Sequence, residues 1–136
     1  MSAQSANALG GDETILLVDD EFMVRDLSRR ILEKHGYDVL EATDGEQALH
    51  VFNHNRDRID LLLTDVIMPK MNGVELRSEL AKLRPDLPAL FMSGYTGNVL
   101  SQSGLNTAEC ELVQKPFTIK ELTAAVRAAL DRKEPA

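Results

Sequence analysis

The sequence lacks the features that mark secreted and membrane-spanning proteins. Its one cysteine, Cys110, cannot form a disulfide within the chain. The first residues, MSAQSANALGGDE, have neither the basic start nor the apolar core of a secretion signal. No run approaches the ~20 apolar residues that cross a bilayer. These absences lead us to expect a cytoplasmic location and no direct contact with a membrane.

Positive charge is also scarce. Lys and Arg number 15 against 22 Asp and Glu, which gives a formal net charge of −7. Nonspecific binding to nucleic acids depends on Lys and Arg to neutralise phosphates, so we expect no direct contact with nucleic acid. The three histidines, His35, His50 and His54, fall in or near predicted helices and do not form a metal-ligand pattern.

What remains is the composition of one soluble domain. The chain has 136 residues, of which 43% are hydrophobic and 27% charged, which is enough to bury a core. Residues 1–12 are small and polar and include Gly10-Gly11, so we expect a flexible leader there. Residues 13–132 are then the domain, and residues 133–136 a tail.

Short apolar runs alternate with helical patterns along the domain. The runs predicted as strands are Thr14–Val18, Asp38–Ala42, Asp60–Thr64, Pro88–Met92 and Glu111–Gln114. The predicted helices are one ending at Gly36, one opened by a capping box from Thr43 to Glu46, Gly73–Leu83, a short one over Asn98–Ser103, and a last one opened by a capping box from Thr118 to Glu121. This alternation predicts an α/β fold with a doubly wound, five-stranded parallel sheet.

Polar residues follow four of these strands where each strand ends. Asp19 and Asp20 follow the first strand, and Asp65 follows the third, in the segment LLLTDVIMPKMNG. Ser93 follows the fourth strand and Lys115 the fifth. Ligand sites of parallel sheets form beyond these carboxyl ends. Two carboxylates about 4 Å apart repel by roughly 4 kcal/mol at an effective dielectric constant near 20, so the gathered acids should recruit a hard cation, for which Mg²⁺ is best suited.

These residue types together indicate phosphoryl transfer. A carboxylate held beside magnesium can attack phosphorus to give an aspartyl phosphate. Lys115 supplies a point charge suited to phosphate, and Ser93 a hydroxyl that can donate to a phosphoryl oxygen. Gly94 has no side chain and so leaves room for the phosphoryl group. No histidine is predicted at this edge to activate water, which favours a lasting acyl phosphate over rapid hydrolysis.

Four segments carry a family resemblance. ILLVDDE, LLLTDVIMPKMNG, LFMSGYT and VQKPF resemble, in order and spacing, the receiver domain of two-component response regulators. MSGYT and QKPF are most similar to receivers of hybrid sensor histidine kinases. The resemblance runs from about Glu13 to Arg132. It implies a flavodoxin-like (βα)5 sheet with strand order 2-1-3-4-5, and a phosphohistidine donor on a histidine kinase or a histidine phosphotransfer domain.

The resemblance also implies a metal site. Asp65 would be the phosphoacceptor. Asp20 and Asp65 would bind Mg²⁺, with Mn²⁺ as an alternative ion, through their side chains. The backbone carbonyl of Ile67 would be the third protein ligand, and Asp19 would act through a water molecule.

Further roles are implied around the phosphoryl group. Lys115 would pair first with the acceptor carboxylate and then with the phosphoryl group, which Ser93 would also bind. Pro116 would follow a cis peptide bond. The chain departs from the family where the switch aromatic is expected, because Leu112 stands there. Ile67 and Tyr95, each two residues after a site residue, would lie at the mouth of the site, where they either slow the access of water or only pack on each other.

Several functions stay open on these grounds. The chain could relay a signal within a hybrid kinase or a phosphorelay, or act as a stand-alone response regulator through protein contacts, as a monomer or weak dimer. It would catalyse its own phosphorylation and dephosphorylation without being a conventional enzyme. A magnesium-dependent phosphatase is disfavoured because Ile67 stands where a second acid is needed. A flavin-binding module is disfavoured because DDEF would repel a phosphate.

Overall fold

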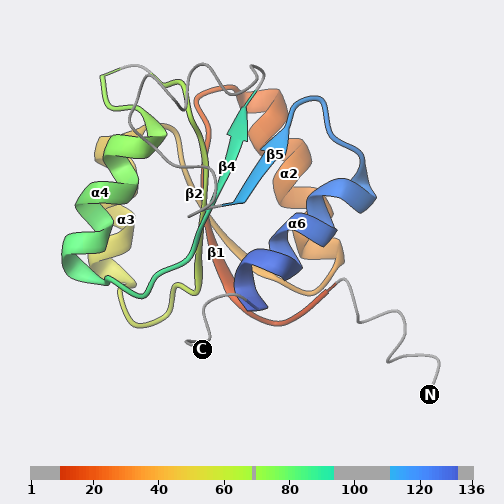
Figure 1. The fold of residues 1–136 in the computed structure, drawn as a ribbon, viewed down its shortest axis with the longest axis horizontal. Helices are drawn as coiled ribbons and strands as arrows, with labels where there is room; N and C mark the ends of the chain where they lie inside the picture. The colour runs from red at the N-terminus through yellow and green to blue at the C-terminus, as the bar shows by residue number, and fades with distance from the viewer. Residues whose placement is uncertain (1–9, 69, 94–110, 132–136) are drawn as a thin grey trace.

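A computed structural model describes residues 10–68, 70–93 and 111–131. Five strands and four helices are described in this part of the chain (Figure 1). The strands are β1 (Thr14–Val18), β2 (Asp38–Ala42), β3 (Leu61–Asp65), β4 (Ala89–Ser93) and β5 (Glu111–Gln114). The helices are α2 (Phe22–Lys34), α3 (Gly45–His54), α4 (Gly73–Leu83) and α6 (Ile119–Asp131).

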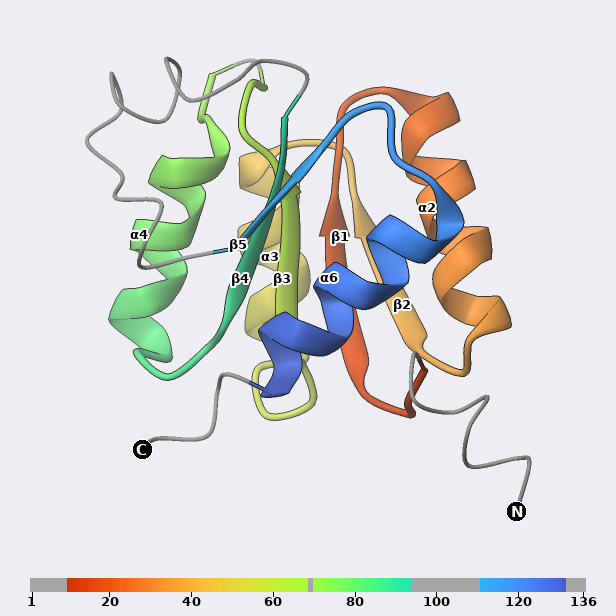
Figure 2. The same ribbon diagram turned by 45° about the vertical axis from the view of Figure 1, so that its right-hand side comes forward.

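The strands form one parallel sheet in the order β2-β1-β3-β4-β5. Helices α3 and α4 cover one face and α2 and α6 the other (Figure 2). This confirms the predicted doubly wound, flavodoxin-like fold and its strand order. All five carboxyl ends therefore lie at the same edge of the sheet.

The sheet separates two cores, which explains why its strands are apolar without alternation. Within β1, Leu16 and Val18 belong to the core beneath α3 and α4, whereas Ile15 and Leu17 belong to the core beneath α2 and α6. Successive side chains of a strand point to opposite faces, so a strand covered on both sides must be apolar at every position.

Strands β3 and β4 each begin and end one residue later than the predicted ranges. Asp60 stands before β3, where its Oδ2 accepts a hydrogen bond of 2.9 Å from the backbone N–H of Thr14. Pro88 stands before β4 and has no N–H to give to a ladder, although its carbonyl accepts from Leu62 N–H. The shift makes Asp65 the last residue of β3.

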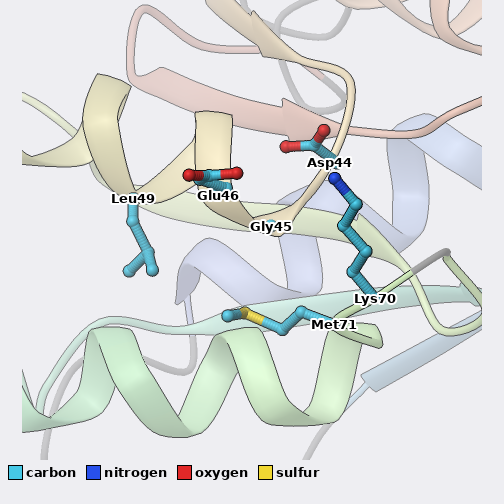
Figure 3. A pocket seen from close by; sticks show the side chains of 6 residues that line it. All are labelled: Asp44, Gly45, Glu46, Leu49, Lys70 and Met71. Carbon is cyan, nitrogen blue, oxygen red and sulfur yellow. The ribbon is translucent and has the colours of Figure 1, made fainter.

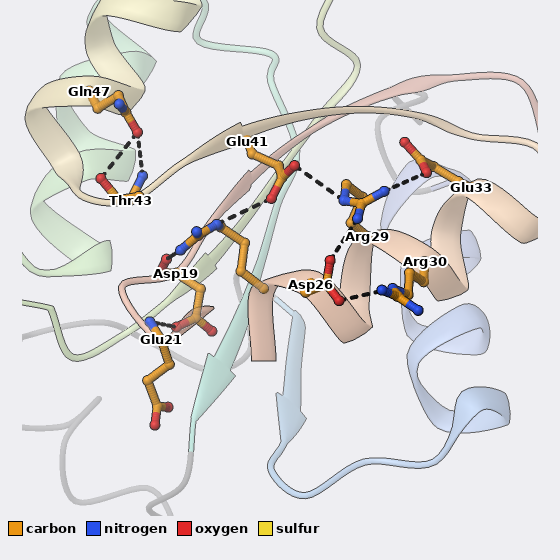
Figure 4. Close-up of polar contacts among 10 residues, drawn as sticks. Asp19, Glu21, Asp26, Arg29, Arg30, Glu33, Glu41, Thr43 and Gln47 are labelled. Atoms are coloured by element: carbon orange, nitrogen blue, oxygen red, sulfur yellow. Dashed lines mark hydrogen bonds and ion pairs between the residues drawn. The ribbon is translucent and has the colours of Figure 1, made fainter. Parts of the chain in front are cut away.

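The predicted capping box from Thr43 to Glu46 is wrong by one position. Asp44 is the N-cap of α3, and its Oδ1 accepts from Gln47 N–H at 2.8 Å. Gln47 Oε1 in turn accepts from the backbone N–H of Thr43 at 2.6 Å (Figure 4). Thr43 is followed three residues later by Glu46, and Asp44 by Gln47, so both pairs have the spacing of a capping box. Aspartate is at least as good an N-cap as threonine.

Other helix boundaries were predicted correctly. Gly36 follows α2 with φ of 100°, the left-handed conformation that glycine adopts without steric cost. Thr118 and Glu121 form the predicted capping box, with hydrogen bonds of 2.8 and 3.0 Å. The predicted helix over residues 98–103 lies outside the described residues. No helix in the described ranges combines the length and the hydropathy that a membrane crossing needs.

Candidate functional site

Two carboxylates and an ammonium meet at the carboxyl edge of the sheet. Asp19 follows β1 directly, Asp65 ends β3, and Lys115 follows β5. Lys115 Nζ lies 3.2 Å from Asp19 Oδ2 and 3.3 Å from Asp65 Oδ2. Asp19 is fully buried, and Asp65 is 7% exposed. The structure therefore brings three of the strand-end residues into direct contact.

Glu21 joins this group, although it follows the first strand in the sequence together with Asp19 and Asp20 and had no predicted role. One carboxylate oxygen each of Asp19, Glu21 and Asp65 lie within 4.8 Å of one another. Glu21 Oε1 is also 3.6 Å from Lys115 Nζ. Its place in the run DDE, between β1 and the start of α2, was the feature of the sequence that could have indicated a role at the site. We call Asp19, Glu21 and Asp65 the acid group.

Asp20 and Ser93 lie at the same edge of the sheet, but neither belongs to the acid group. The side chain of Asp20 is exposed and stands outside the acid group. Ser93 is the last residue of β4 and is buried, and its backbone carbonyl accepts from Lys115 N–H at 2.8 Å. This bond continues the β4–β5 ladder past the end of β5 and fixes where the lysine leaves the sheet.

The loop that carries Asp19 is held by hydrogen bonds. Asp19 N–H donates to the carbonyl of Ala42 at 3.2 Å, which extends the β1–β2 pairing by one residue. Asp19 Oδ1 accepts from Glu21 N–H at 2.9 Å. Because Oδ2 faces Lys115, both oxygens of this buried carboxylate have partners, as burial of a charge requires.

Burial controls the electrostatics of the site. It raises the pKa of Asp65 to about 6, against the attraction of Lys115, and the charges of Asp19 and Asp20 add to the rise. Burial likewise raises the pKa of Asp19. For Lys115, burial acts to lower the pKa, but the carboxylates of Asp65 and Asp19 outweigh it and the pKa is raised. One ammonium therefore faces an excess of carboxylates.

The donor set fits a small, hard divalent cation. The acid group offers only oxygen ligands. An octahedral ion with bonds of about 2.1 Å holds neighbouring ligand oxygens roughly 3 Å apart and opposite ones roughly 4.2 Å apart. The oxygens of the acid group lie within 4.8 Å of one another, which is close enough for small movements to bring them around one ion. The excess of negative charge among these carboxylates would attract such an ion.

The remaining predicted site residues do not belong to the acid group. The Lys115–Pro116 peptide bond is cis, as the resemblance implies. The side chain of Ile67 is exposed, and a ligand role for its backbone carbonyl stays a prediction. Leu112 is half-buried against the core beneath α3 and α4, opposite Phe91 in the β4–β5 pairing. Gly94 and Tyr95 lie outside the described residues.

A cavity lies beside the start of α3. It has a volume of about 280 Å³ between the start of α3 and the loop before α4 (Figure 3). Its lining residues are Asp44, Gly45, Glu46, Leu49, Lys70 and Met71. The cavity lies at the same edge of the sheet, where α3 begins, but none of its lining residues belongs to the acid group.

Comparison with known proteins agrees with this geometry. The sensor kinase CckA of Brucella abortus is 35% identical over 131 residues, which are 96% of this chain and 14% of that protein. The response regulator MprA of Mycobacterium leprae is 39% identical over 121 residues, which are 89% of this chain and 52% of that protein. The chain thus spans only a part of the length of these relatives.

Solved structures and the family's sequence pattern point the same way. The crystal structure of the receiver domain from the hybrid histidine kinase CckA superposes with a TM-score of 0.73 at 38% identity, covering 86% of this chain and 98% of that one. The response regulator receiver domain family matches residues 15–127, which include Asp19, Asp65 and Lys115. The chain therefore belongs to the response regulator receiver domain family of two-component signalling.

Proposed function

We propose that Asp65 accepts a phosphoryl group from a phosphohistidine in a reaction that needs Mg²⁺. The observation that carries this proposal is the position of its carboxylate. It is the last residue of β3, it belongs to the acid group, and it lies 3.3 Å from Lys115 Nζ. A buried carboxylate with these neighbours is costly for folding alone, which favours a functional role.

The reaction exchanges one bond to phosphorus for another. An oxygen of the Asp65 carboxylate attacks phosphorus, the bond from phosphorus to the donor's imidazole nitrogen breaks, and that nitrogen keeps the electron pair and takes a proton. A magnesium ion, when bound, would neutralise charge on the transferring oxygens. Asp19 and Glu21 would hold it together with Asp65, and Asp20 remains the further ligand that the resemblance implies.

The remaining polar residues would receive the product. Lys115 already pairs with Asp65 and would pair with a phosphoryl oxygen once the carboxylate is phosphorylated. Ser93 stands at the end of the neighbouring strand, where its hydroxyl would donate to another oxygen. The shift in these contacts would bias the domain between two surface shapes and so transmit the signal.

Slow hydrolysis is expected from the placement of the histidines. His35 follows the last residue of α2, and His54 is the last residue of α3, with the ring of His50 beside it at 4.4 Å between centroids. Both helices begin at the edge that carries the acids, so these imidazoles lie at the far ends. A water molecule near Asp65 therefore has no imidazole base in the described part of the chain.

An apolar face beside the site suggests where the donor docks. Phe22, Met23 and Leu27 of α2 and Ile119 of α6 are exposed although they are large and hydrophobic. A cavity of about 330 Å³ next to them is lined by Val24, Leu27, Lys115, Pro116 and Phe117. Exposed apolar patches of this kind mark protein contacts. We assign this face to the histidine kinase or histidine phosphotransfer domain that carries the phosphohistidine.

The test is phosphorylation by acetyl phosphate with Mg²⁺, followed by intact mass. The wild type should gain one phosphoryl group, and it should gain none when the metal is chelated. Asp65→Asn should stay unmodified, whereas Asp57→Asn, on an exposed turn after α3, should behave as the wild type. Modification of the Asp65→Asn variant at the wild-type rate would refute the proposal.

The relatives support a place in a relay. CckA, with which this chain shares 35% identity, is a sensor kinase far longer than the chain. We propose that the domain exchanges phosphoryl groups with a histidine phosphotransfer partner as part of such a relay, and that a stand-alone response regulator is the alternative. Transfer from the phosphorylated chain back to the histidine of a phosphotransfer domain would support the relay, and strictly one-way transfer would support the alternative.

A further inference from the structure

Arg25, in the first turns of α2, is tied to the loop that carries the acids. Its Nη1 donates to the backbone carbonyl of Asp19 at 2.8 Å. Its Nε pairs with Glu41 Oε1 of β2 at 3.2 Å. Its guanidinium also lies over the ring of Phe22, 5.6 Å from the centroid. The side chain is only 13% exposed, so these contacts hold it in one place.

Glu41 is in turn held from its other side. Its Oε2 pairs with Arg29 Nε at 3.2 Å, and Arg29 also contacts Asp26 and Glu33 on α2 (Figure 4). The charged face of α2 thereby fixes the carboxylate that orients Arg25. A guanidinium with two acceptors and a ring beneath it is preorganised, and a lysine could not satisfy both acceptors at once.

The carbonyl that Arg25 holds belongs to the peptide between Asp19 and Asp20. Asp19 N–H is bound to Ala42, and Asp19 Oδ1 is bound to Glu21 N–H. With the Asp19 carbonyl bound as well, the orientation of this planar peptide is fixed. The backbone on the N-terminal side of Asp20 is therefore fixed, and the hydrogen bond of Glu21 N–H to Asp19 limits the remaining rotation about the N–Cα bond of Asp20.

We propose that Arg25 is a positioning residue of the metal site: its hydrogen bond to the Asp19 carbonyl sets the peptide that presents the Asp20 carboxylate to a divalent cation. The inference rests on the proposed function, because it concerns the same Mg²⁺. Partners that orient metal ligands without touching the ion change metal affinity by about 10–100-fold when they are removed.

The sign of the effect separates positioning from plain electrostatics. Arg25 carries a positive charge close to several carboxylates, and such a charge repels a divalent cation. If charge were its only influence, Arg25→Met would bind Mg²⁺ more tightly and Arg25→Lys would bind it as the wild type does. Positioning predicts the opposite for Arg25→Met, and it predicts weaker binding for Arg25→Lys although the charge is kept.

The experiment is titration of the full chain with Mg²⁺ alone by calorimetry. We expect Arg25→Met to raise the dissociation constant by about 10-fold or more and Arg25→Lys by a smaller factor in the same direction. Arg30→Met is the matched control, because Arg30 lies on the same helix, pairs with Asp26 at 2.9 Å and is 71% exposed. Its dissociation constant should stay within about two-fold of the wild type.

Two further readouts exclude a general loss of structure. In the metal-free protein, the amide resonances of Asp20 and Glu21 should shift in Arg25→Met and stay in place in Arg30→Met. In phosphorylation by acetyl phosphate, the Mg²⁺ concentration for half-maximal rate should rise more than the maximal rate falls. An unfolded fraction would instead change the far-UV circular dichroism of the metal-free variant, which a displaced metal ligand leaves as in the wild type.

The outcomes distinguish the two proposals. A wild type that binds no Mg²⁺ would overturn the proposed function itself. A wild type that binds the ion, with an unchanged or tighter constant in Arg25→Met, would overturn only the positioning role of Arg25. If Arg25→Met does not fold, the test rests on Arg25→Lys. A Mg²⁺ affinity of Arg25→Lys equal to that of the wild type would then refute the inference.

Discussion

Lys115 Nζ lies 3.3 Å from Asp65 Oδ2 and 3.2 Å from Asp19 Oδ2, so one ammonium serves two buried carboxylates. The three residues come from different strand ends, and only the parallel sheet brings them together. Removing one member of a buried charge cluster leaves the others uncompensated. Each charge in this cluster therefore has a consequence that can be measured separately.

Replacement of the ammonium tests the largest attractive contact of Asp65. We expect Lys115→Met to raise the pKa of Asp65 above its value of about 6, because burial would then act without opposition from a cation. The rate of phosphorylation should fall by about 100-fold, the usual effect of losing a preorganised charge partner of a transferring group. Carboxyl carbon NMR titration measures the first effect, and intact mass over time the second. A lower pKa in the variant would contradict this account.

Asp65 should make the metal-free protein less stable at neutral pH. Its carboxyl has a pKa of about 6 in the folded state against an ordinary value of 3.8, so the folded state binds the proton more tightly than the unfolded state. Stability therefore falls as pH rises between these two values and stays low above about pH 6. Below about pH 4 both states are protonated and the penalty disappears.

Asp65→Asn tests this linkage directly. The variant should exceed the wild type in free energy of unfolding by up to about 3 kcal/mol near pH 8, and the difference should vanish near pH 4. Urea unfolding at both pH values without Mg²⁺ measures it, with Asp57→Asn as the control. Added Mg²⁺ should stabilise the wild type and leave Asp65→Asn nearly unaffected. A variant that is less stable than the wild type near pH 8 would show that the carboxylate contributes to folding.

The sequence was sufficient to predict the architecture because the strands are buried on both faces. Their apolar runs stand out from the amphipathic helices between them, and parallel strands place their ends at one edge. The ends of β3 and β4 were missed by one residue. Those limits depend on Asp60, which accepts a hydrogen bond from Thr14 of the neighbouring strand β1, 46 residues earlier in the sequence, and on Pro88, which has no N–H for the sheet. Neither contact can be read from the pattern of apolar residues.

The site was predictable where it follows strand ends and not where it depends on a helix. Asp19, Asp65 and Lys115 were found by their positions after β1, in β3 and after β5. Glu21 and Arg25 were missed because both belong to the start of α2, where the sequence indicates only a solvent-facing turn. Their contacts are set by how α2 packs against β2 and the site, which is a tertiary property.

The charge of Glu21 should raise the affinity for the cation. Glu21→Gln keeps the size of the side chain and removes one negative charge from the acid group. Because this side chain is largely exposed, we expect only a modest weakening of Mg²⁺ binding, by about 3–10-fold. Calorimetric titration measures it, with Glu79→Gln on α4 as the control. Unchanged affinity would remove Glu21 from the set of residues that influence the metal.

Arg127 and Glu13 link the two ends of the domain, far from the acid group. Arg127 Nη2 lies 2.8 Å from Glu13 Oε2, Nη1 lies 3.3 Å from Oε1, and Nη1 also donates to the carbonyl of Gly10 at 3.0 Å. Although burial opposes it, the hydrogen bond from Arg127 lowers the pKa of Glu13 below 4.5. A lowered folded-state pKa means stability that is present above the unfolded value and is lost as pH falls through the folded value.

Glu13→Gln should therefore destabilise the domain at neutral pH and not in acid. We expect a loss of about 1 kcal/mol near pH 7, since the bidentate pair is mostly shielded from water, and no difference near pH 3. Urea unfolding at the two pH values measures it. Asp131→Asn is the matched control, because Asp131 contacts the same guanidinium at 3.0 Å but is far more exposed. An equal loss in both variants, or a loss that persists near pH 3, would mean that the charge of Glu13 is not what stabilises this end of the domain.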